Sequence, residues 1–301
     1  MDRYEQFRLA AIDRGIPEDE IAVFADQLRF AIWLGTGDPD EQAVGQKGGL
    51  PRLPVGAEWP GSANGSPLPF IASIDCAALP RAEGLPLPAD GSLLFFLHHE
   101  DDVEDEAHTS VPVHARALHV PAGTETAVAS PPSDHDTRTF FHENIPFLLP
   151  EHPISAWIET ALPKWISEEE YDFNSEVEER LFDDLKHVEQ LRELVDELWP
   201  DSGRGATIRI GGYVSNIGGQ DTPWTQMAYA GLTSQLDHPA LPGQERLNRS
   251  EVEEYRLIRE WLPLAQFYTT SEFYYGCFLI SSDDLAGGHF DRMLSFTMFS
   301  E

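Results

Sequence analysis

The densest group of potentially reactive side chains runs from His98 to His108, with the order His-His-Glu-Asp-Asp-Val-Glu-Asp-Glu-Ala-His. Imidazole nitrogens and carboxylate oxygens bind zinc and harder divalent cations. The candidate metal ligands are therefore His98, His99, Asp101 and His108. The segment has neither the helical histidine pair of zinc proteases nor the regular spacing of a calcium loop. A solvated acidic loop is the competing interpretation, and the lack of a specific motif favours it.

Other arrangements indicate less chemistry. The triplet Asp-His-Asp at 134–136 places an imidazole between carboxylates, but no nucleophile is tied to it. A Gly-x-Ser-x-Gly elbow is absent, and Cys76 and Cys277 lie in apolar segments typical of buried thiols. The glycine-rich stretch 211–219 matches no phosphate-binding fingerprint, which favours turns and bulges. The sequence thus assigns no catalytic residue and points to no particular cofactor.

The elements that would position such residues begin with a helical hairpin. Apolar residues at 4, 7 and 11 share one helical face, Gly15 ends that helix, and Pro17 opens the next. Apolar residues at 21, 24, 28 and 32 then recur at helical spacing until Gly35. We therefore predict an N-terminal helical segment over 1–35, followed by one domain over 36–301.

Strands are predicted where proline and glycine exclude long helices. Residues 36–90 are dense in both, and the apolar stretches 69–74 and 92–97 have the length of strands. Alternating apolar residues over 111–120 predict a third strand, and 121–153 has the composition of a loop-rich connection.

Two capped helices are predicted in the second half of the chain. Ser175 and Glu178 form a capping box, after which apolar residues continue at helical steps as far as Trp199. A second helix is expected from Ser250 until just before Pro263. Residues 273–300 have the pattern of a strand, a short helix and a strand.

One order of features occurs twice in the chain. A basic residue and a glycine pair are followed by a tryptophan, a strand and a glycine-led apolar strand, first over 47–96 and again over 209–280. In the second set the strand after the tryptophan would be 225–227. This order predicts an internal duplication, with halves at about 45–150 and 205–300 joined by a helical region over 153–200.

A crevice between two such halves is the place to expect a ligand. Residues near the repeated features are the candidates for its lining: Lys47, Trp59, Asp75, Trp224 and Gln226. The two tryptophans have an alternative role as core residues, which is the more common one for large aromatic side chains.

The same blocks carry a family resemblance. Lys-Gly-Gly-Leu-Pro-Arg-Leu-Pro at 47–54, Glu-Trp-Pro at 58–60 and Pro-Leu-Pro-Phe-Ile-Ala-Ser-Ile-Asp at 67–75 resemble the YwqG-like bacterial family, as do later pieces up to about residue 300. Ser73 stands where that family usually has glutamine. The resemblance implies an α+β fold of two related β-rich halves in mostly antiparallel sheet. The family has no known function, so no catalytic residue is implied.

The amino-acid composition limits the classes of partner that the protein is expected to bind. The chain has 52 Asp and Glu against 20 Lys and Arg, a formal charge of −32, so it is expected to avoid nucleic acid and anionic membranes. The N-terminus has no signal-peptide pattern and no apolar run is long enough to span a membrane, which predicts a cytoplasmic protein. The acidic charge suits a basic protein partner, although it can also serve solubility alone.

Three functions remain open on these grounds. The first is a non-enzymatic binding protein that recognises a basic protein, with an immunity-type role as its specific form, or a small ligand. The alternative is a metal-dependent enzyme that uses the loop at 98–108. A third interpretation is a structural scaffold held by the helices, which predicts stable oligomers.

Overall fold

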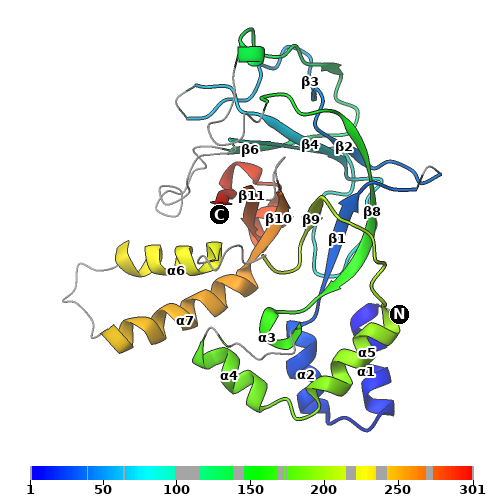
Figure 1. Cartoon of the computed structure of the whole chain (residues 1–301), viewed down its shortest axis with the longest axis vertical. Coiled ribbons are helices and arrows are strands. Elements are labelled where there is room, and N and C mark those ends of the chain that lie inside the picture. The colour runs from blue at the N-terminus through cyan, green and yellow to red at the C-terminus, as the bar shows by residue number, and fades with distance from the viewer. Residues whose placement is uncertain are drawn as a thin grey trace.

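Ten strands form one sheet at the centre of the molecule (Figure 1). The computed structural model describes residues 2–38, 40–63, 65–98, 115–137, 146–167, 173, 175–214, 222–234, 243–268 and 274–299. The strand order is β12-β11-β10-β9-β1-β8-β2-β4-β5-β6, and neighbouring described strands pair antiparallel. The strands are β1 (Arg29–Gly35), β2 (Gly45–Lys47), β4 (Phe70–Asp75), β5 (Ser92–Leu97), β6 (Ala115–Val120), β8 (His152–Ala161), β9 (Ile208–Ile210), β10 (Trp261–Tyr268), β11 (Tyr274–Ser281) and β12 (Leu294–Phe299).

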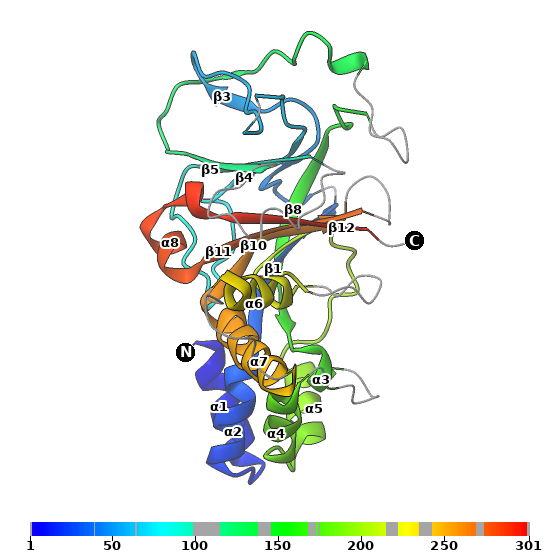
Figure 2. The same ribbon diagram turned by 90° about the vertical axis from the view of Figure 1, so that its left-hand side faces the viewer.

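The sheet curls until its two ends face each other (Figure 2). Phe95 on β5 contacts Phe278 on β11, with ring centroids 5.2 Å apart, and His119 on β6 lies 5.6 Å from Phe290. The inner faces of both ends therefore share one apolar core, which also receives residues from the N-terminal helices. A separate two-stranded ribbon, β3 (Arg52–Pro54) with β7 (Thr126–Val128), lies outside this sheet.

Apart from α8, which follows β11, the helices flank the sheet in two groups (Figure 1). One group lies below the sheet in this view, and α6 and α7 form a pair beside it. The helices are α1 (Arg3–Asp13), α2 (Glu18–Gln27), α3 (Lys164–Ser167), α4 (Glu176–Asp183), α5 (Val188–Leu198), α6 (Pro223–Ser234), α7 (Gly243–Glu260) and α8 (Ser282–Gly287), with 3-10 turns η1 (His135–Thr137) and η2 (Phe290–Arg292). Among the described residues, no helix combines the length and the apolar character that crossing a membrane requires.

The N-terminal hairpin is confirmed as far as Gln27, but its second helix does not continue to Gly35. Asp2 caps α1 by accepting a hydrogen bond from the backbone N–H of Glu5. After Leu28 the chain becomes extended and β1 pairs with both β8 and β9. Residues 30–32, 34 and 35 are buried, so both faces of β1 are largely covered, and the apolar spacing that predicted a helix also fits such a strand.

The strands expected at 69–74 and 92–97 are confirmed as β4 and β5. The third, expected over 111–120, is confirmed as β6 from Ala115, and 111–114 lie outside the described residues. The region 153–200 was expected to be helical throughout, but it begins with the ten-residue strand β8. Paired with β1 along its length, β8 supplies a central strand of the sheet.

The long helix predicted after Ser175 is two helices. Ser175 caps α4 as expected, by accepting a hydrogen bond from the N–H of Glu178. The chain then breaks before α5, where the buried carboxylate of Glu20 accepts a hydrogen bond from the backbone N–H of His187 at 2.9 Å. The same carboxylate lies 3.0 Å from Nδ1 of His187. A carboxylate from a distant helix thus satisfies an amide that a continuous helix would have used itself.

Two further predictions in the second half are wrong. Residues 225–227 are not a strand but part of α6, which Thr222 caps by accepting from the N–H of Thr225. The helix expected from Ser250 begins at Gly243 and ends at Glu260, so Ser250 is a buried interior residue and not a cap. Pro263 stands within β10, at a register shift where the strand tolerates a missing N–H. The C-terminal strand, short helix and strand are confirmed.

The two ends of the sheet share a topology. From the central β1–β8 pair, β8 leads outward to β2, β4, β5 and β6, and β1 leads to β9, β10, β11 and β12. Each end starts with a three-residue strand, and each of these strands precedes a glycine pair with positive φ. The φ angles are 70° and 74° for Gly48 and Gly49, and 78° and 72° for Gly211 and Gly212.

The glycine pairs also make matching hydrogen bonds. The N–H of Gly48 donates to the carbonyl of Ile71 at 2.8 Å, and the N–H of Gly211 donates to that of Pro263 at 2.7 Å. Both carbonyls lie at register shifts, one in β4 and one in β10. By topology, β10 is therefore the counterpart of β4.

A glutamine completes each glycine turn. Nε2 of Gln46 donates to the carbonyls of Gly48 and Leu50, at 3.0 and 3.2 Å. Nε2 of Gln266 donates to the carbonyls of Gly211 and Tyr213, each at 3.1 Å. One glutamine comes from the short strand and the other from the strand beside it. The two turns are therefore held by the same bonds from different strands.

Candidate functional site

A cavity of about 700 Å³ lies where the outer face of the sheet meets the helices. Its walls come from segments far apart in the sequence, between Gln27 and Ile258. Five aromatic residues are among those that line it: Trp33, Trp165, Tyr213, Trp224 and Tyr255. Four charged residues line it as well: Lys164, Glu178, Arg209 and Glu254. The size and the aromatic walls are those of a small-molecule site.

The sheet contributes a row of side chains from neighbouring strands. Trp33 on β1 pairs in register with Trp157 on β8 and with Arg209 on β9, and residues paired in register point to the same face. The guanidinium of Arg209 lies over the Trp33 ring, 5.5 Å from its centroid, and that of Arg204 lies 4.0 Å from the centroid of Trp157. Two arginine–tryptophan pairs therefore lie side by side on this face, with Arg204 coming from the segment before β9.

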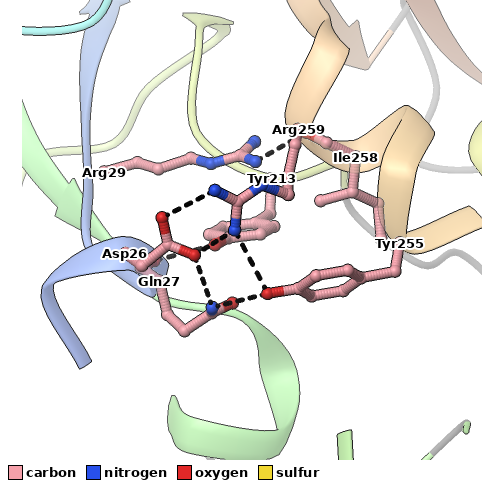
Figure 3. Close-up of polar contacts among 7 residues, drawn as sticks. All are labelled: Asp26, Gln27, Arg29, Tyr213, Tyr255, Ile258 and Arg259. Carbon is pink, nitrogen blue, oxygen red and sulfur yellow. Dashed lines mark hydrogen bonds and ion pairs between the residues drawn. The ribbon is translucent and has the colours of Figure 1, made fainter. Parts of the chain in front are cut away.

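A hydrogen-bonded network forms a second wall of the cavity (Figure 3). The hydroxyl of Tyr213 donates to the carbonyl of Gln27 at 2.7 Å, and Nε2 of Gln27 donates to the hydroxyl of Tyr255 at 3.1 Å. These bonds join the end of α2, the turn after Gly212 and the helix α7. The three side chains that line this wall are thus fixed by contacts between distant segments.

Two arginines that do not line the cavity brace this wall (Figure 3). Arg29 donates to the carbonyls of Gly212 and Ile258, at 2.9 and 2.6 Å, and its guanidinium lies 4.2 Å from the centroid of the Tyr213 ring. Arg259 on α7 forms an ion pair with both carboxylate oxygens of Asp26 on α2. The planar guanidinium lies over the ring while its two terminal nitrogens reach two separate carbonyls, a geometry that the compact ammonium group of lysine does not reproduce.

The turn before this wall requires glycine. Gly212 has a φ of 72°, and a Cβ at this position would lie 3.1 Å from Cβ of Ala161 and 3.3 Å from Cβ of Ala31. Small residues on the sheet and the absence of a side chain on the turn let Tyr213 approach the cavity.

Helix α6 closes the cavity on a third side. Trp224 is buried, with 2% of its surface exposed, and packs among apolar residues of β11 and β12. Its Nε1 finds no hydrogen-bond partner in the part of the chain that the structure describes. Glu254 on α7 accepts hydrogen bonds from the hydroxyls of Thr225 at 2.7 Å and Thr222 at 3.4 Å, which ties the start of α6 to α7.

Burial changes the ionisation of Tyr213. Desolvation raises the pKa of its hydroxyl to about 12, against the opposing effect of the Arg29 charge beside it. The phenol therefore stays a neutral hydrogen-bond donor across the physiological range.

The five residues predicted to line a crevice occupy different parts of the fold. Trp224 lines the cavity, and Gln226 follows it on α6. Lys47 ends β2, and burial lowers the pKa of its ammonium group. Trp59 packs against Phe96 and Phe147 and donates to the carbonyl of Leu68, as a core residue does, while Asp75 caps the turn after β4.

The metal prediction concerns residues that are mostly outside the described ranges. Of the four residues predicted to bind the metal, His98 is described, while His99, Asp101 and His108 are not. Elsewhere in the described chain, no group of three or more His, Cys, Asp or Glu side chains is arranged to hold a metal ion. The loop at 98–108 therefore stays a prediction.

Both cysteines are buried thiols, as their apolar neighbourhoods predicted. Burial raises the pKa of Cys76 to about 11 and raises that of the fully enclosed Cys277 as well. Neither is activated as a nucleophile.

Most cavity residues carried no functional signal in the sequence. Trp33 fell within the segment 1–35 predicted to be helical and was not singled out, and neither was Gln27. Arg209 and Tyr213 stood out only as neighbours of the repeated glycine pair, which is the one pattern that leads to this wall.

The chain belongs to a family described as a domain of unknown function (DUF1963), which matches residues 46–297. A search of the curated proteins finds no match to the chain. The matched residues include most of the sheet and the helices α3 to α8, whereas α1, α2 and β1 precede them. Gln27 and Trp33 therefore reach the cavity from outside the matched region.

Proposed function

We propose that this chain is a binding protein whose small ligand occupies the 700 Å³ cavity between the sheet, α6 and α7. The observation that carries the proposal is the cavity's construction. Aromatic side chains from β1, α7 and the turn after Gly212 line it. Arg29 bonds to both the turn and α7, and Gln27 bonds to Tyr255 of α7, so these two elements are held in place. Preformed walls that combine aromatic side chains with polar groups held in place favour small-molecule binding.

Native mass spectrometry of freshly purified protein tests this function. Ser167 is exposed at the rim of the cavity, so Ser167→Trp should obstruct it without touching the core. Ser130→Trp, on an exposed loop after β7, is the matched control. We expect a small molecule to be released on unfolding from the wild type and the control, and lost from Ser167→Trp. A ligand retained equally by all three proteins, or absent from all three, contradicts the proposal.

A basic protein partner is the second candidate, and the distribution of charge supports it. Surface arginines such as Arg14 and Arg204 pair with carboxylates, yet α5 keeps acidic residues exposed, among them Glu193 and Asp196. An acidic surface of this kind steers a basic partner. An immunity-type role, with a basic toxin as partner, is the specific form of this proposal.

Charge reversal tests the partner proposal. The double variant Glu193→Lys with Asp196→Lys should weaken the binding of a basic partner that has been identified by capture and then purified. The loss of affinity should be smaller at high salt. Glu125→Lys with Asp136→Lys changes the net charge equally on another surface and is the control. If both pairs of substitutions reduce the affinity for the partner equally, the effect is one of net charge, and a docking face on α5 is rejected.

The matching glycine turns support a further proposal, that the two ends of the sheet arose by duplication. Their shared topology, register shifts and glutamine bonds are its basis. We also propose that the YwqG-like resemblance and the matched family are one group, and that the protein is cytoplasmic.

A further inference from the structure

Resting on the proposed ligand-binding function, we propose that the cavity takes a planar aromatic anion. In this arrangement, the ring of the ligand lies among the aromatic walls and Arg209 is its counter-ion. The inference concerns the chemistry of the ligand and depends on the sheet side of the cavity.

Aromatic surface comes from several segments around the cavity. Trp33 on the sheet, Tyr213 after Gly212 and Tyr255 on α7 are each partly exposed, in contrast to the buried Trp165 and Trp224. Partly exposed aromatic side chains around one cavity favour an aromatic ring among them, through ring–ring contacts and burial of apolar area.

The charged residues that line the cavity bear on the charge of the ligand. Acidic residues outnumber basic ones by 52 to 20 in the whole chain, but the cavity has two of each. One of its carboxylates, Glu254, already accepts two threonine hydroxyls that hold α6 to α7. Arg209 belongs to the sheet wall itself, and Lys164 is exposed at the rim. The cavity is thus much less acidic than the chain around it.

The geometry of Arg209 suits an anionic group on a flat ring. Its guanidinium carbon lies over the Trp33 ring, 5.5 Å from the centroid, and β9 is held between β1 and β10. A guanidinium donates in its own plane, in the fork geometry that matches carboxylate, sulfonate and phosphate oxygens. A ring beside Trp33 with an acidic substituent would meet both partners at once.

Two fluorescent probes that differ by one charge test the proposal on the intact chain. The anion is 8-anilinonaphthalene-1-sulfonate, and N-phenyl-1-naphthylamine is the same ring system without the sulfonate. We expect the sulfonate to bind one site, roughly ten- to hundredfold more tightly than the neutral probe, because a charge-assisted hydrogen bond contributes a factor of that size. Ser167→Trp should block both probes.

Variants of the arginines identify the counter-ion. Arg209→Gln should reduce sulfonate affinity about as much as removal of the sulfonate does, and leave the neutral probe unchanged. Arg204→Gln is the control, since Arg204 stacks on Trp157 in the same row but does not line the large cavity. The comparison of the two probes on the wild type needs no variant to fold.

The outcomes separate this inference from the function on which it rests. If both probes bind equally and Ser167→Trp blocks them, the anionic class is wrong and the binding function stands. The same holds if Arg209→Gln has no effect on the sulfonate. If neither probe binds, or Ser167→Trp does not matter, both proposals fail.

Discussion

Replacing Gly48 by alanine tests whether the turn after β2 is crowded as well as left-handed. Gly48 has a φ of 70°, and a Cβ there would lie 2.2 Å from the carbonyl oxygen of Pro150. Gly123 has a φ of 80°, and a Cβ there would meet nothing within 4 Å. The two glycines share the backbone conformation and differ in their surroundings, so Gly123→Ala is the matched control.

The expected difference follows from two separate costs. A left-handed alanine costs about 1–2 kcal/mol at either position. At Gly48, the Pro150 carbonyl must also move away, although the neighbouring N–H of Gly49 is bonded to the carbonyl of Leu149 at 2.8 Å. Such overpacking costs about 1–3 kcal/mol more. We therefore expect losses of about 1–2 kcal/mol for Gly123→Ala and about 2–5 kcal/mol for Gly48→Ala.

Urea denaturation followed by tryptophan fluorescence measures both variants. A shift of the midpoint with an unchanged slope reports a change in the free energy of unfolding. Equal midpoints for Gly48→Ala and Gly123→Ala would show that contact with Pro150 has no energetic effect, and would refute this reasoning.

Four further results are expected. The pKa of Tyr213 is raised from 10.0 to about 12, so between these pH values the folded chain holds more protons than the unfolded chain. The free energy of unfolding should therefore fall by about 2–3 kcal/mol from pH 10 to 12. Paired urea titrations should show a smaller fall for Tyr213→Phe. Arg29→Lys should destabilise the chain by about 1–3 kcal/mol in the same assay, because a single ammonium nitrogen cannot take the place of two separated donor nitrogens and the planar contact with Tyr213, and an unchanged midpoint would contradict the bracing role. Cys76 and Cys277 should react with a thiol reagent only after unfolding, so fast labelling of the native chain would argue against burial. Elemental analysis of chelator-free protein should find no stoichiometric metal, whereas about one zinc per chain would favour the enzyme built on 98–108.

Local patterns predicted elements well where one local cause dominates. Ser175 capped a helix because its side chain reaches the third following amide whatever lies elsewhere in the fold. The strands β4 and β5 were predicted from short apolar runs between proline and glycine, and both are buried. The glycine pairs at 48–49 and 211–212 were recognised as matching, and both have positive φ.

Errors arose where a distant partner decided the conformation. The helical spacing of apolar residues that begins in α2 extends into residues 29–35. These residues nevertheless form a strand, because they pair with β8 on one side and β9 on the other. The helix after Ser175 broke because Glu20, from α2, accepts the N–H of His187. Such contacts join residues far apart in the chain, so spacing within a window does not contain them.

By itself the sequence determined the acidic character, the mixed α and β composition, the caps and the glycine turns, since each depends on residue type or near neighbours. Only the tertiary structure decided the cavity. Trp33, Arg209 and Tyr255 come from β1, β9 and α7, and strand register and the bonds of Arg29 bring their elements together. A binding surface assembled from distant segments is a property of packing, which local periodicity does not encode.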